Sequence, residues 1–298
     1  MPVAIQIPAV RAAHPPRADE LAEFLGTVEA AGFHSAWVME NQLGDAAALE
    51  PLSVLAFAAG HTNSIRLGVA VAILATHQPV RLARQAATID HLSDGRLTLG
   101  VGIGSPGLPF GAFGISAGER AARFEEHLAV MRRLWEEPEV DHTGRFVELT
   151  GARMEPKPVQ HPLPVWFGAS SPAALRRTAR LADGWIGAGS SPSSAFPAML
   201  AQLRESLEAE GRDPTSFPVG KRAYVAIDRP ADEVGKWFQA VYGGAIAPEV
   251  ALSGTAAQVV EELLELREAG ADLLLVSPVG DDQPQLELVI EHVLPALR

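Results

Sequence analysis

The sequence contains no cysteine among its 298 residues. Disulfide bonds, thiolate metal ligands and a cysteine nucleophile are therefore excluded. Long apolar runs are missing as well, since none reaches the roughly 18–20 residues that a membrane-spanning helix needs. The amino-terminal stretch MPVAIQIPAV also lacks the basic segment of a secretory signal peptide. We therefore expect a soluble, cytoplasmic protein without a membrane partner.

Basic residues are fewer than acidic residues. Lysine and arginine total 24 against 36 aspartates and glutamates, so the net charge is −12. Because nucleic acids and anionic membranes attract basic surfaces, this balance argues against either as the main partner. The nine histidines show no HExxH or similar spacing, so no metal site is predicted.

Short apolar runs alternate with segments of helical period along the whole chain. Eight runs predict buried strands, at Val3–Ile7, Ala36–Met39, Leu67–Leu74, Leu97–Val101, Pro164–Phe167, Trp185–Ala188, Ala223–Ile227 and Leu273–Val276. The segments between them carry apolar stripes such as Leu21, Phe24, Leu25 and Val28, and Gly32, Gly211 and Gly270 each follow a helical run. This alternation predicts an α/β protein, a single (β/α)8 TIM barrel, with a doubly wound open sheet as the alternative.

Two stretches are longer than a simple strand-to-helix loop. Residues 102–150 contain a Gly/Pro-rich loop, a long helix and an extra strand near Phe146, and residues 229–254 look irregular. Loops of this size in a compact domain commonly act as lids or bind ligands. We find no repeat or linker, so we expect one domain over 1–298 with these two insertions.

A glycine-rich segment, Gly102-Ile-Gly-Ser-Pro-Gly107, matches GxGxxG after a strand. A dinucleotide site would need a helix to begin inside this motif, so that its amino terminus faces the pyrophosphate. Pro106 and Pro109 stand where that helix would start, which disfavours this interpretation. We favour a loop in which the backbone passes close to a flat ligand, because glycine permits such an approach.

Two neighbouring loops are suited to an anion. Gly168-Ala-Ser-Ser-Pro172 follows a strand and opens a helix, and Gly187-Ala-Gly-Ser-Ser191 follows the next strand. A helix amino terminus offers free N–H groups and a positive dipole, and adjacent loops of this kind commonly build phosphate sites in barrels. A plain helix cap explains Ser171 and Pro172 equally well.

Two ionisable residues follow predicted strands two and three. Glu40 ends the second strand, where a carboxylate is costly unless it has partners. His77 follows the third strand and is the histidine best placed for chemistry, although a surface histidine without function is the more common case. Asp90, Asp94 and Arg96 predict a turn with an ion pair.

The block from Arg66 to Gly104, RLGVAVAILATHQPVRLARQAATIDHLSDGRLTLGVGIG, resembles the bacterial luciferase-like family of flavin- and F420-dependent oxidoreductases. The resemblance covers nearly the whole chain and implies a (β/α)8 barrel that binds FMN or F420 at the carboxyl ends of its strands. It implies a non-prolyl cis peptide, Ala70–Val71, behind the middle ring. The implied cofactor contacts are Gly102 and Gly104 beside the ring and Gly168, Ala169 and Ser170 at the phosphate, to which the second loop adds Gly187.

Three departures from the family's pattern bear on the chemistry. Glu40-Asn41 stands where many members have an acid followed by histidine, and Gln78-Pro79 stands where His-Pro is usual. Ser105 replaces the glutamate of the family's sugar-phosphate dehydrogenases, which disfavours that activity. We expect Glu40 and Asn41 to hydrogen-bond near the ring edge and His77 to be the general acid or base.

The leading hypothesis is F420-dependent hydride transfer to or from a small organic substrate. The alternatives are an FMN-dependent monooxygenase served by a flavin reductase, a flavin-binding subunit without turnover, and a metal-free aldolase or isomerase. The aldolase would need a Schiff-base lysine, and Lys157, Lys221 and Lys236 are the whole supply. The resemblance also implies a homodimer, with the helix that carries Ala83, Ala86, Ala87 and Ile89 at its interface.

Overall fold

The computed structural model describes residues 1–105, 107–280 and 283–298. Eight parallel strands form its centre: β1 (Val3–Gln6), β3 (Ser35–Val38), β5 (Arg66–Ile73), β6 (Leu97–Gly102), β9 (Val165–Gly168), β10 (Gly184–Gly187), β11 (Val219–Ile227) and β13 (Leu273–Pro278). Each strand pairs with the next in chain order, and β13 also pairs with β1. The pairing of Trp185 in β10 with Val219 in β11 completes a closed ring. The predicted barrel is therefore confirmed, and the open sheet is wrong.

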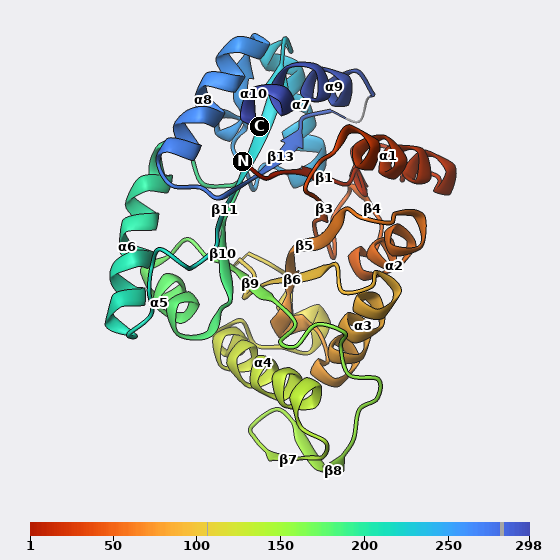
Figure 1. Cartoon of the computed structure of the whole chain (residues 1–298), viewed down its shortest axis with the longest axis vertical. Helices are drawn as coiled ribbons and strands as arrows, with labels where there is room; N and C mark the ends of the chain where they lie inside the picture. Colours follow the sequence, from red (N-terminus) through yellow and green to blue (C-terminus); the bar gives the residue numbers. More distant parts are fainter. Residues whose placement is uncertain (106, 281–282) are drawn as a thin grey trace.

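Helices surround this barrel (Figure 1). They are α1 (Ala18–Ala31), α2 (Pro51–His61), α3 (Pro79–Leu92), α4 (Arg120–Glu136), α5 (Pro172–Leu181), α6 (Phe196–Ala209), α7 (Ala231–Tyr242) and α8 (Ala256–Glu268), followed by α9 (Gln283–Leu288), a π turn (Val289–Val293) and α10 (Leu294–Leu297). The glycines expected at helix ends, Gly32, Gly211 and Gly270, all have positive φ, at 81°, 69° and 111°. Only glycine enters this region without steric penalty, which is why these helices end there.

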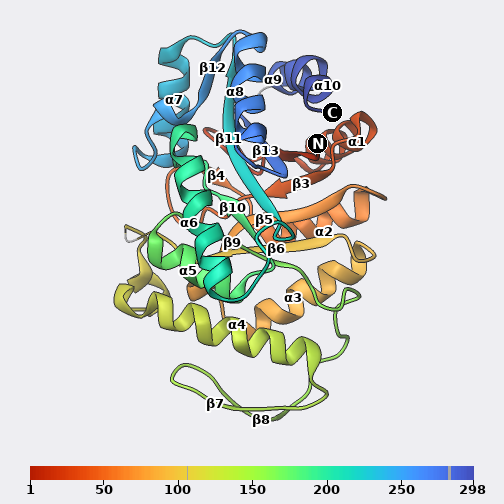
Figure 2. The same ribbon diagram turned by 60° about the vertical axis from the view of Figure 1, so that its left-hand side comes forward.

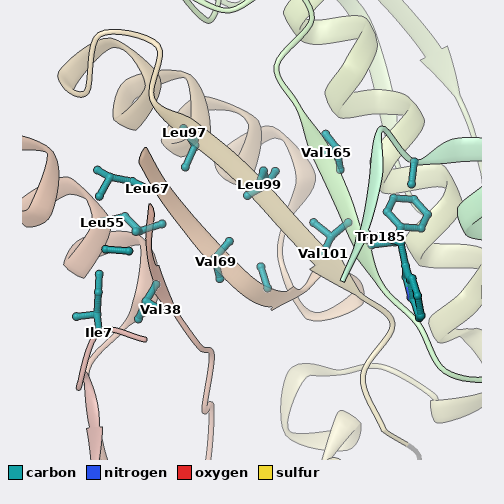
Figure 3. Close-up of a cluster of buried hydrophobic side chains, with 14 of the residues drawn as sticks. Ile7, Val38, Leu55, Leu67, Val69, Leu97, Leu99, Val101, Val165 and Trp185 are labelled. Carbon is teal, nitrogen blue, oxygen red and sulfur yellow. The ribbon is translucent and has the colours of Figure 1, made fainter. Parts of the chain in front are cut away.

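The core has two layers. Strand residues that point outward, among them Leu67, Val69 and Leu99, pack against the helices, and Figure 3 shows part of this layer. Inward residues fill the barrel, where Trp37 and Trp166 lie with ring centroids 5.9 Å apart. These indoles occupy the space where a Cβ on Gly68 or Gly184 would come within about 2.5 Å of them.

The first insertion holds a two-stranded hairpin rather than a single extra strand. β7 (Val140–Thr143) and β8 (Glu148–Ala152) pair antiparallel, and Phe146 lies in the turn between them, which corrects the prediction. The hairpin lies beside α4 at one end of the molecule (Figure 2). The guanidinium groups of Arg123 and Arg145 lie 4.3 and 4.9 Å from the Phe146 ring centroid, so cation–π contacts stabilise the turn.

The second insertion is more regular than expected. Helix α7 fills residues 231–242, because Val234, Phe238 and Val241 recur at helical spacing and are buried. A short strand, β12 (Leu252–Gly254), then pairs with the end of β11. The insertion therefore covers the rim of the barrel at β11 with an ordered wall.

The turn between α3 and β6 is confirmed, whereas its expected ion pair is wrong. Asp94 and Gly95 both adopt positive φ. The Asp90 carboxylate accepts hydrogen bonds from the backbone N and Nε2 of Gln160. Arg96 instead donates to backbone carbonyls, including that of Ile65 at 2.7 Å. A long arginine reaches several carbonyl acceptors at once, which sequence distance does not reveal.

The four residues expected at a dimer interface are buried inside the single chain. Ala83, Ala86, Ala87 and Ile89 are at most 2% exposed and pack in the core. The prediction that these side chains form a dimer interface is therefore wrong, because they are not exposed. A homodimer formed by other residues remains a prediction, which light scattering would contradict by giving the mass of a single chain.

Glu29 makes a strong link between α1 and the loop before β5. Its carboxylate accepts hydrogen bonds from the backbone N atoms of Asn63, Ser64 and Ile65, at 2.9, 2.7 and 3.0 Å. Burial raises its pKa, but these donors outweigh burial and lower it to about 2. Because the folded-state pKa lies below the unfolded value, the stabilisation is present above about pH 4.5 and is lost as pH falls toward 2.

We expect Glu29→Gln to reduce the free energy of unfolding at pH 7 by about 1–3 kcal/mol, since hydrogen bonds to a charged group are lost. The variant should also lose less stability than the wild type between pH 5 and pH 3. Urea unfolding at each pH measures both effects. Glu23→Gln, on the exposed part of the same helix, is the control. An unchanged acid dependence in the Glu29 variant would contradict the assignment.

Candidate functional site

A cavity of about 570 Å³ opens at the carboxyl ends of the barrel strands. Its wall is built by the ends of β3, β5, β6, β9, β10 and β11 and by the end of α7. All eight predicted cofactor-binding residues line this one cavity: Ala70, Val71, Gly102, Gly104, Gly168, Ala169, Ser170 and Gly187. These residues are up to 117 positions apart in the chain, and closure of the barrel brings them together.

The β5 wall of the cavity has an irregular backbone. The Ala70–Val71 peptide is cis, as predicted, and the register of β5 against β6 shifts between Val69 and Ala72. The shift turns Val71 toward the cavity instead of the outer core. Small apolar groups therefore form a surface suited to a flat ring.

Gly102 and Gly168 make room for Val71. A Cβ added to Gly102 would lie 2.7 Å from Val71 Cγ2, and one added to Gly168 would lie 2.9 Å from Val71 Cγ1. The Val71 side chain is thus a reason for glycine at both positions, besides the close ligand approach that the sequence suggested. The three residues form one interlocked surface from three strands.

The GxGxxG segment does not open a helix. Gly102 ends β6, Gly104 turns the chain with φ +76°, and the next α-helix, α4, begins only at Arg120. Pro106, which argued against such a helix, lies outside the described residues. Residues 103–105 form a loop that lines the cavity, and the dinucleotide interpretation receives no support from the described residues.

We expect Gly102→Ala to weaken binding of the ring ligand by about 10–100-fold, because Val71 must move to admit the new methyl group. The double variant Val71→Ala with Gly102→Ala should recover most of that loss, since the second change frees the volume the first one takes. Fluorescence titration with F420 and FMN measures both. Gly60→Ala, whose added Cβ meets nothing within 4 Å, is the control. Equal losses in the single and double variants would contradict this account.

Glu40 and His77, predicted separately, form a pair. His77 Nε2 lies 2.7 Å from Glu40 Oε1, and the backbone N of Ile73 donates to Glu40 Oε2. The Glu40 side chain is 5% exposed and lines the cavity, whereas His77 stands behind it. Both carboxylate oxygens are therefore fixed from the β5 side, which satisfies the requirement that a buried carboxylate has partners.

The pair sets the protonation of His77. Burial lowers the pKa of the imidazole, but the hydrogen bond and the charge of Glu40 outweigh burial and raise it above its usual value. A proton can thus be held between Nε2 and Oε1 near neutral pH. Asn41, the third predicted site residue, is half-buried next to Glu40 and is absent from the described cavity wall.

A second part of the cavity wall suits an anion, namely the amino terminus of α5 with the loop after β10, which we call the α5 anion site. Ser171 caps α5 by accepting a hydrogen bond from the backbone N of Ala174, and Trp185 Nε1 fixes the loop through the carbonyl of Ala169 at 2.9 Å. Gly187, Gly189 and Ser190 add the neighbouring loop. Arg120, the first residue of α4, also lines the cavity; its Nη1 donates to the Ala117 carbonyl at 2.6 Å, whereas its buried Nε has no hydrogen-bond partner among the described residues. A helix amino terminus and a guanidinium N–H without a partner in the wall of one cavity favour a phosphate ligand.

Sequence reasoning missed the cavity wall formed by Arg222, Tyr224 and Tyr242. The first two are on β11, and Tyr242 ends α7. One signal was present, since the run VGKRAYVAI places two basic residues inside a strand that is otherwise apolar. All nine residues of this strand are buried, so both cations need partners.

The lysines do not support a Schiff-base enzyme. Lys221 Nζ donates to the carbonyls of Ala188 and Ser191 at 2.6 and 3.0 Å, and burial lowers its pKa to about 8. It supports the loop after β10 from behind the cavity wall. Lys157 donates to the Leu134 carbonyl, and the Lys236 side chain is 76% exposed. None of the three lines the cavity.

No helix in the described part of the chain is both long and apolar enough to cross a membrane. Comparison with known proteins gives matches over much of the chain. An uncharacterised protein of Mycobacterium tuberculosis is 36% identical over 194 residues, which are 64% of this chain and 66% of that protein. A putative coenzyme F420-dependent oxidoreductase of the same organism is 32% identical over 250 residues, 76% of this chain and 69% of that protein.

Among solved structures, a monooxygenase from Streptomyces bottropensis superposes with a TM-score of 0.84 at 25% identity and full coverage of both chains. The family model described as luciferase-like monooxygenase matches residues 1–250. That match spans the barrel from β1 through β11 and includes every predicted site residue. The chain therefore belongs to the luciferase-like monooxygenase family.

Proposed function

We propose that this protein is an oxidoreductase that binds the deazaflavin F420 and transfers hydride to or from a small organic substrate. The observation that carries the proposal is the single cavity in which the Val71 surface, the glycines of β6 and β9 and the α5 anion site all meet. The M. tuberculosis relative named as a putative F420-dependent oxidoreductase supports the choice of cofactor.

The residues present fit such a cofactor. The apolar surface of Ala70 and Val71 would support the ring, and the backbone of Gly168–Ser170 together with Arg120 would hold the phosphate. F420, when bound, supplies two-electron hydride chemistry, and the protein supplies binding, orientation and electrostatics.

Glu40 is the residue that we propose to handle protons. Its carboxylate lines the cavity, and His77 holds or releases a proton at Nε2, 2.7 Å from Oε1. His77 acts through Glu40, so it is a positioning residue. The cavity wall is mostly apolar, and the low exposure of Glu40 strengthens the interaction between the two groups.

A second candidate, an FMN-dependent monooxygenase with a separate flavin reductase, is favoured by the similarity to the S. bottropensis monooxygenase. FMN carries the same kind of flat ring and a phosphate, so the cavity also suits it. A flavin-binding subunit without turnover is the third possibility. The small-molecule substrate is unspecified in all three.

Titration of the protein with F420 and with FMN, followed by fluorescence, separates these functions. We expect F420 to bind at least about tenfold more tightly, which corresponds to roughly 1.4 kcal/mol. Arg120→Gln should weaken both ligands, while Arg153→Gln, whose side chain is 74% exposed on the hairpin, should weaken neither. Preference for FMN would favour the monooxygenase. Binding of neither would overturn the proposed function.

A further inference from the structure

Arg222 is a buried cation whose partners are all neutral. Its Nε donates to Ser277 Oγ at 3.0 Å, and Nη2 donates to Gln6 Oε1 and contacts Met39 Sδ and Tyr242 OH at 3.4 and 3.5 Å. The guanidinium carbon lies 4.7 Å from the Tyr224 ring centroid. Within residues 1–105, 107–280 and 283–298, no carboxylate pairs with it and Nη1 has no hydrogen-bond partner.

Such an arrangement is costly without an anion. A buried guanidinium is normally balanced by a carboxylate, and neutral oxygen and sulfur acceptors compensate its charge only in part. Arg222 is 9% exposed and forms part of the cavity wall. The remaining capacity of this side chain is therefore available to a molecule in the cavity.

Tyr242 adds a second donor at the same place. Its hydroxyl lies 2.6 Å from that of Tyr224, where either oxygen can be the donor, and 3.4 Å from Met39 Sδ, which is a further acceptor. A thioether sulfur is a weak acceptor, so a stronger oxygen acceptor would readily replace it. Burial raises the pKa of Tyr242 well above its usual value, so the hydroxyl remains protonated as a donor.

The cluster stands opposite the proposed ring surface. Around the barrel, β11 is four strands away from β5, which carries Ala70 and Val71. A ring ligand that packs against the β5 surface would therefore leave the space between its other face and β11 for a substrate. Arg222 and Tyr224 also contact the loop after β10, because a Cβ on Gly189 would lie 3.3 Å from Arg222 Cδ and 2.8 Å from Tyr224 Cε2. The cap of α5 follows β9, which is two strands away from β11.

We propose that Arg222 and Tyr242 bind the carboxylate of an anionic organic substrate, which rests on the proposed function and specifies its substrate class. Guanidinium N–H groups match the two oxygens of a carboxylate, and the phenol adds a third hydrogen bond. The substrate's apolar part would face the ring and the side chains of Ile186 and Ile246, which also line the cavity.

The test uses the full-length protein loaded with whichever of F420 or FMN binds, and a series of straight-chain carboxylates with their matching amides as probes. Calorimetry should show each acid binding about 10–100-fold more tightly than its amide, because only the acid matches the buried charge. Arg222→Gln should abolish this preference. Arg153→Gln, on the remote hairpin, should retain it.

Because Arg222 also holds Gln6 and Ser277, circular dichroism checks that its variants fold. Tyr242→Phe, which keeps the ring and removes only the hydroxyl, gives an independent result and should weaken acid binding by about three- to tenfold. Equal binding of acids and amides, including no binding of either, would overturn the proposal. So would an Arg222 variant in which cofactor affinity falls as much as acid affinity, since Arg222 would then serve the cofactor.

The outcome is distinguishable from failure of the proposed function. If neither F420 nor FMN binds the wild-type protein, the oxidoreductase assignment fails before the probes are used. If the cofactor binds and the acids show no preference, only the substrate class is wrong.

Discussion

Glu40→Gln is expected to lower turnover by about 100-fold, the contribution typical of a positioned proton-transfer group. An amide in place of the carboxylate retains the side chain's shape and its acceptor for the Ile73 N–H. It removes the negative charge that raises the pKa of His77. Burial, the largest influence, is then opposed only by the more distant charge of Glu50, so the pKa of His77 falls.

The pH dependence provides a signature that a structural role alone would not produce. Whether protonated or neutral His77 is the active form, the corresponding limb of the pH–rate profile should move to lower pH in the Glu40 variant. Histidine NMR titration measures the same shift without a substrate. In the wild type, the raised folded-state pKa stabilises the protein fully below about pH 6.5. That stabilisation is lost as pH rises through the folded-state pKa, and the variant should lack it.

A double-variant cycle tests whether the two residues act together. If His77 acts through Glu40, His77→Gln combined with Glu40→Gln should reduce turnover little more than the larger single change. Glu148→Gln, an exposed carboxylate on the hairpin, is the matched control and should leave turnover unchanged. Full activity in Glu40→Gln, or an unmoved His77 pKa, would refute the assigned role.

Gly100→Ala is expected to have the largest effect on stability, a loss of about 3 kcal/mol or more in the free energy of unfolding, at the upper end of the cost of overpacking a buried site. A Cβ at this position would lie 2.0 Å from the carbonyl oxygen of Val69 and 3.5 Å from Val71 Cγ1. The obstacle is backbone of the neighbouring strand, which no side-chain rotation can remove. Strands β5 and β6 must therefore separate where they support the cavity wall.

Urea unfolding at 25 °C measures this effect. Gly60→Ala in α2 is the control, because its added methyl group meets open space. In the Gly60→Ala variant we expect the free energy of unfolding to rise by about 0.5–1 kcal/mol, since alanine loses less backbone entropy than glycine when a helix forms. A Gly100 variant within 1 kcal/mol of the wild type would show that β5 tolerates displacement and would contradict the close packing described here.

Local pattern predicted most of the fold. The eight strands follow from apolar runs, and the helix ends follow from glycines such as Gly32 and Gly211 that adopt positive φ. The resemblance of the Arg66–Gly104 block predicted the Ala70–Val71 cis peptide and pointed to Gly102 and Gly104, which line the cavity. These features depend on residues close together in the chain, so a one-dimensional pattern is sufficient to detect them.

Contacts across the barrel were not accessible in this way. The pairing of Glu40 with His77 crosses 37 positions, and the contact between Arg222 and Gln6 crosses 216. The Asp90 carboxylate likewise bonds Gln160, 70 positions away, instead of the nearby Arg96. Which partner each of these side chains finds depends on which segments the closed barrel brings together.

The sequence by itself determined the eight barrel strands and most helix ends, because hydrophobic period and backbone-permissive glycines act locally, and its resemblance to a known family supplied the eight residues that line the cavity. Only the tertiary structure decided that Val71 is the reason for Gly102 and Gly168, that Glu40 stands before His77, and that Arg222 faces the cavity without a carboxylate. The physical reason is that burial, charge compensation and excluded volume depend on distance in space, which closure of the barrel sets.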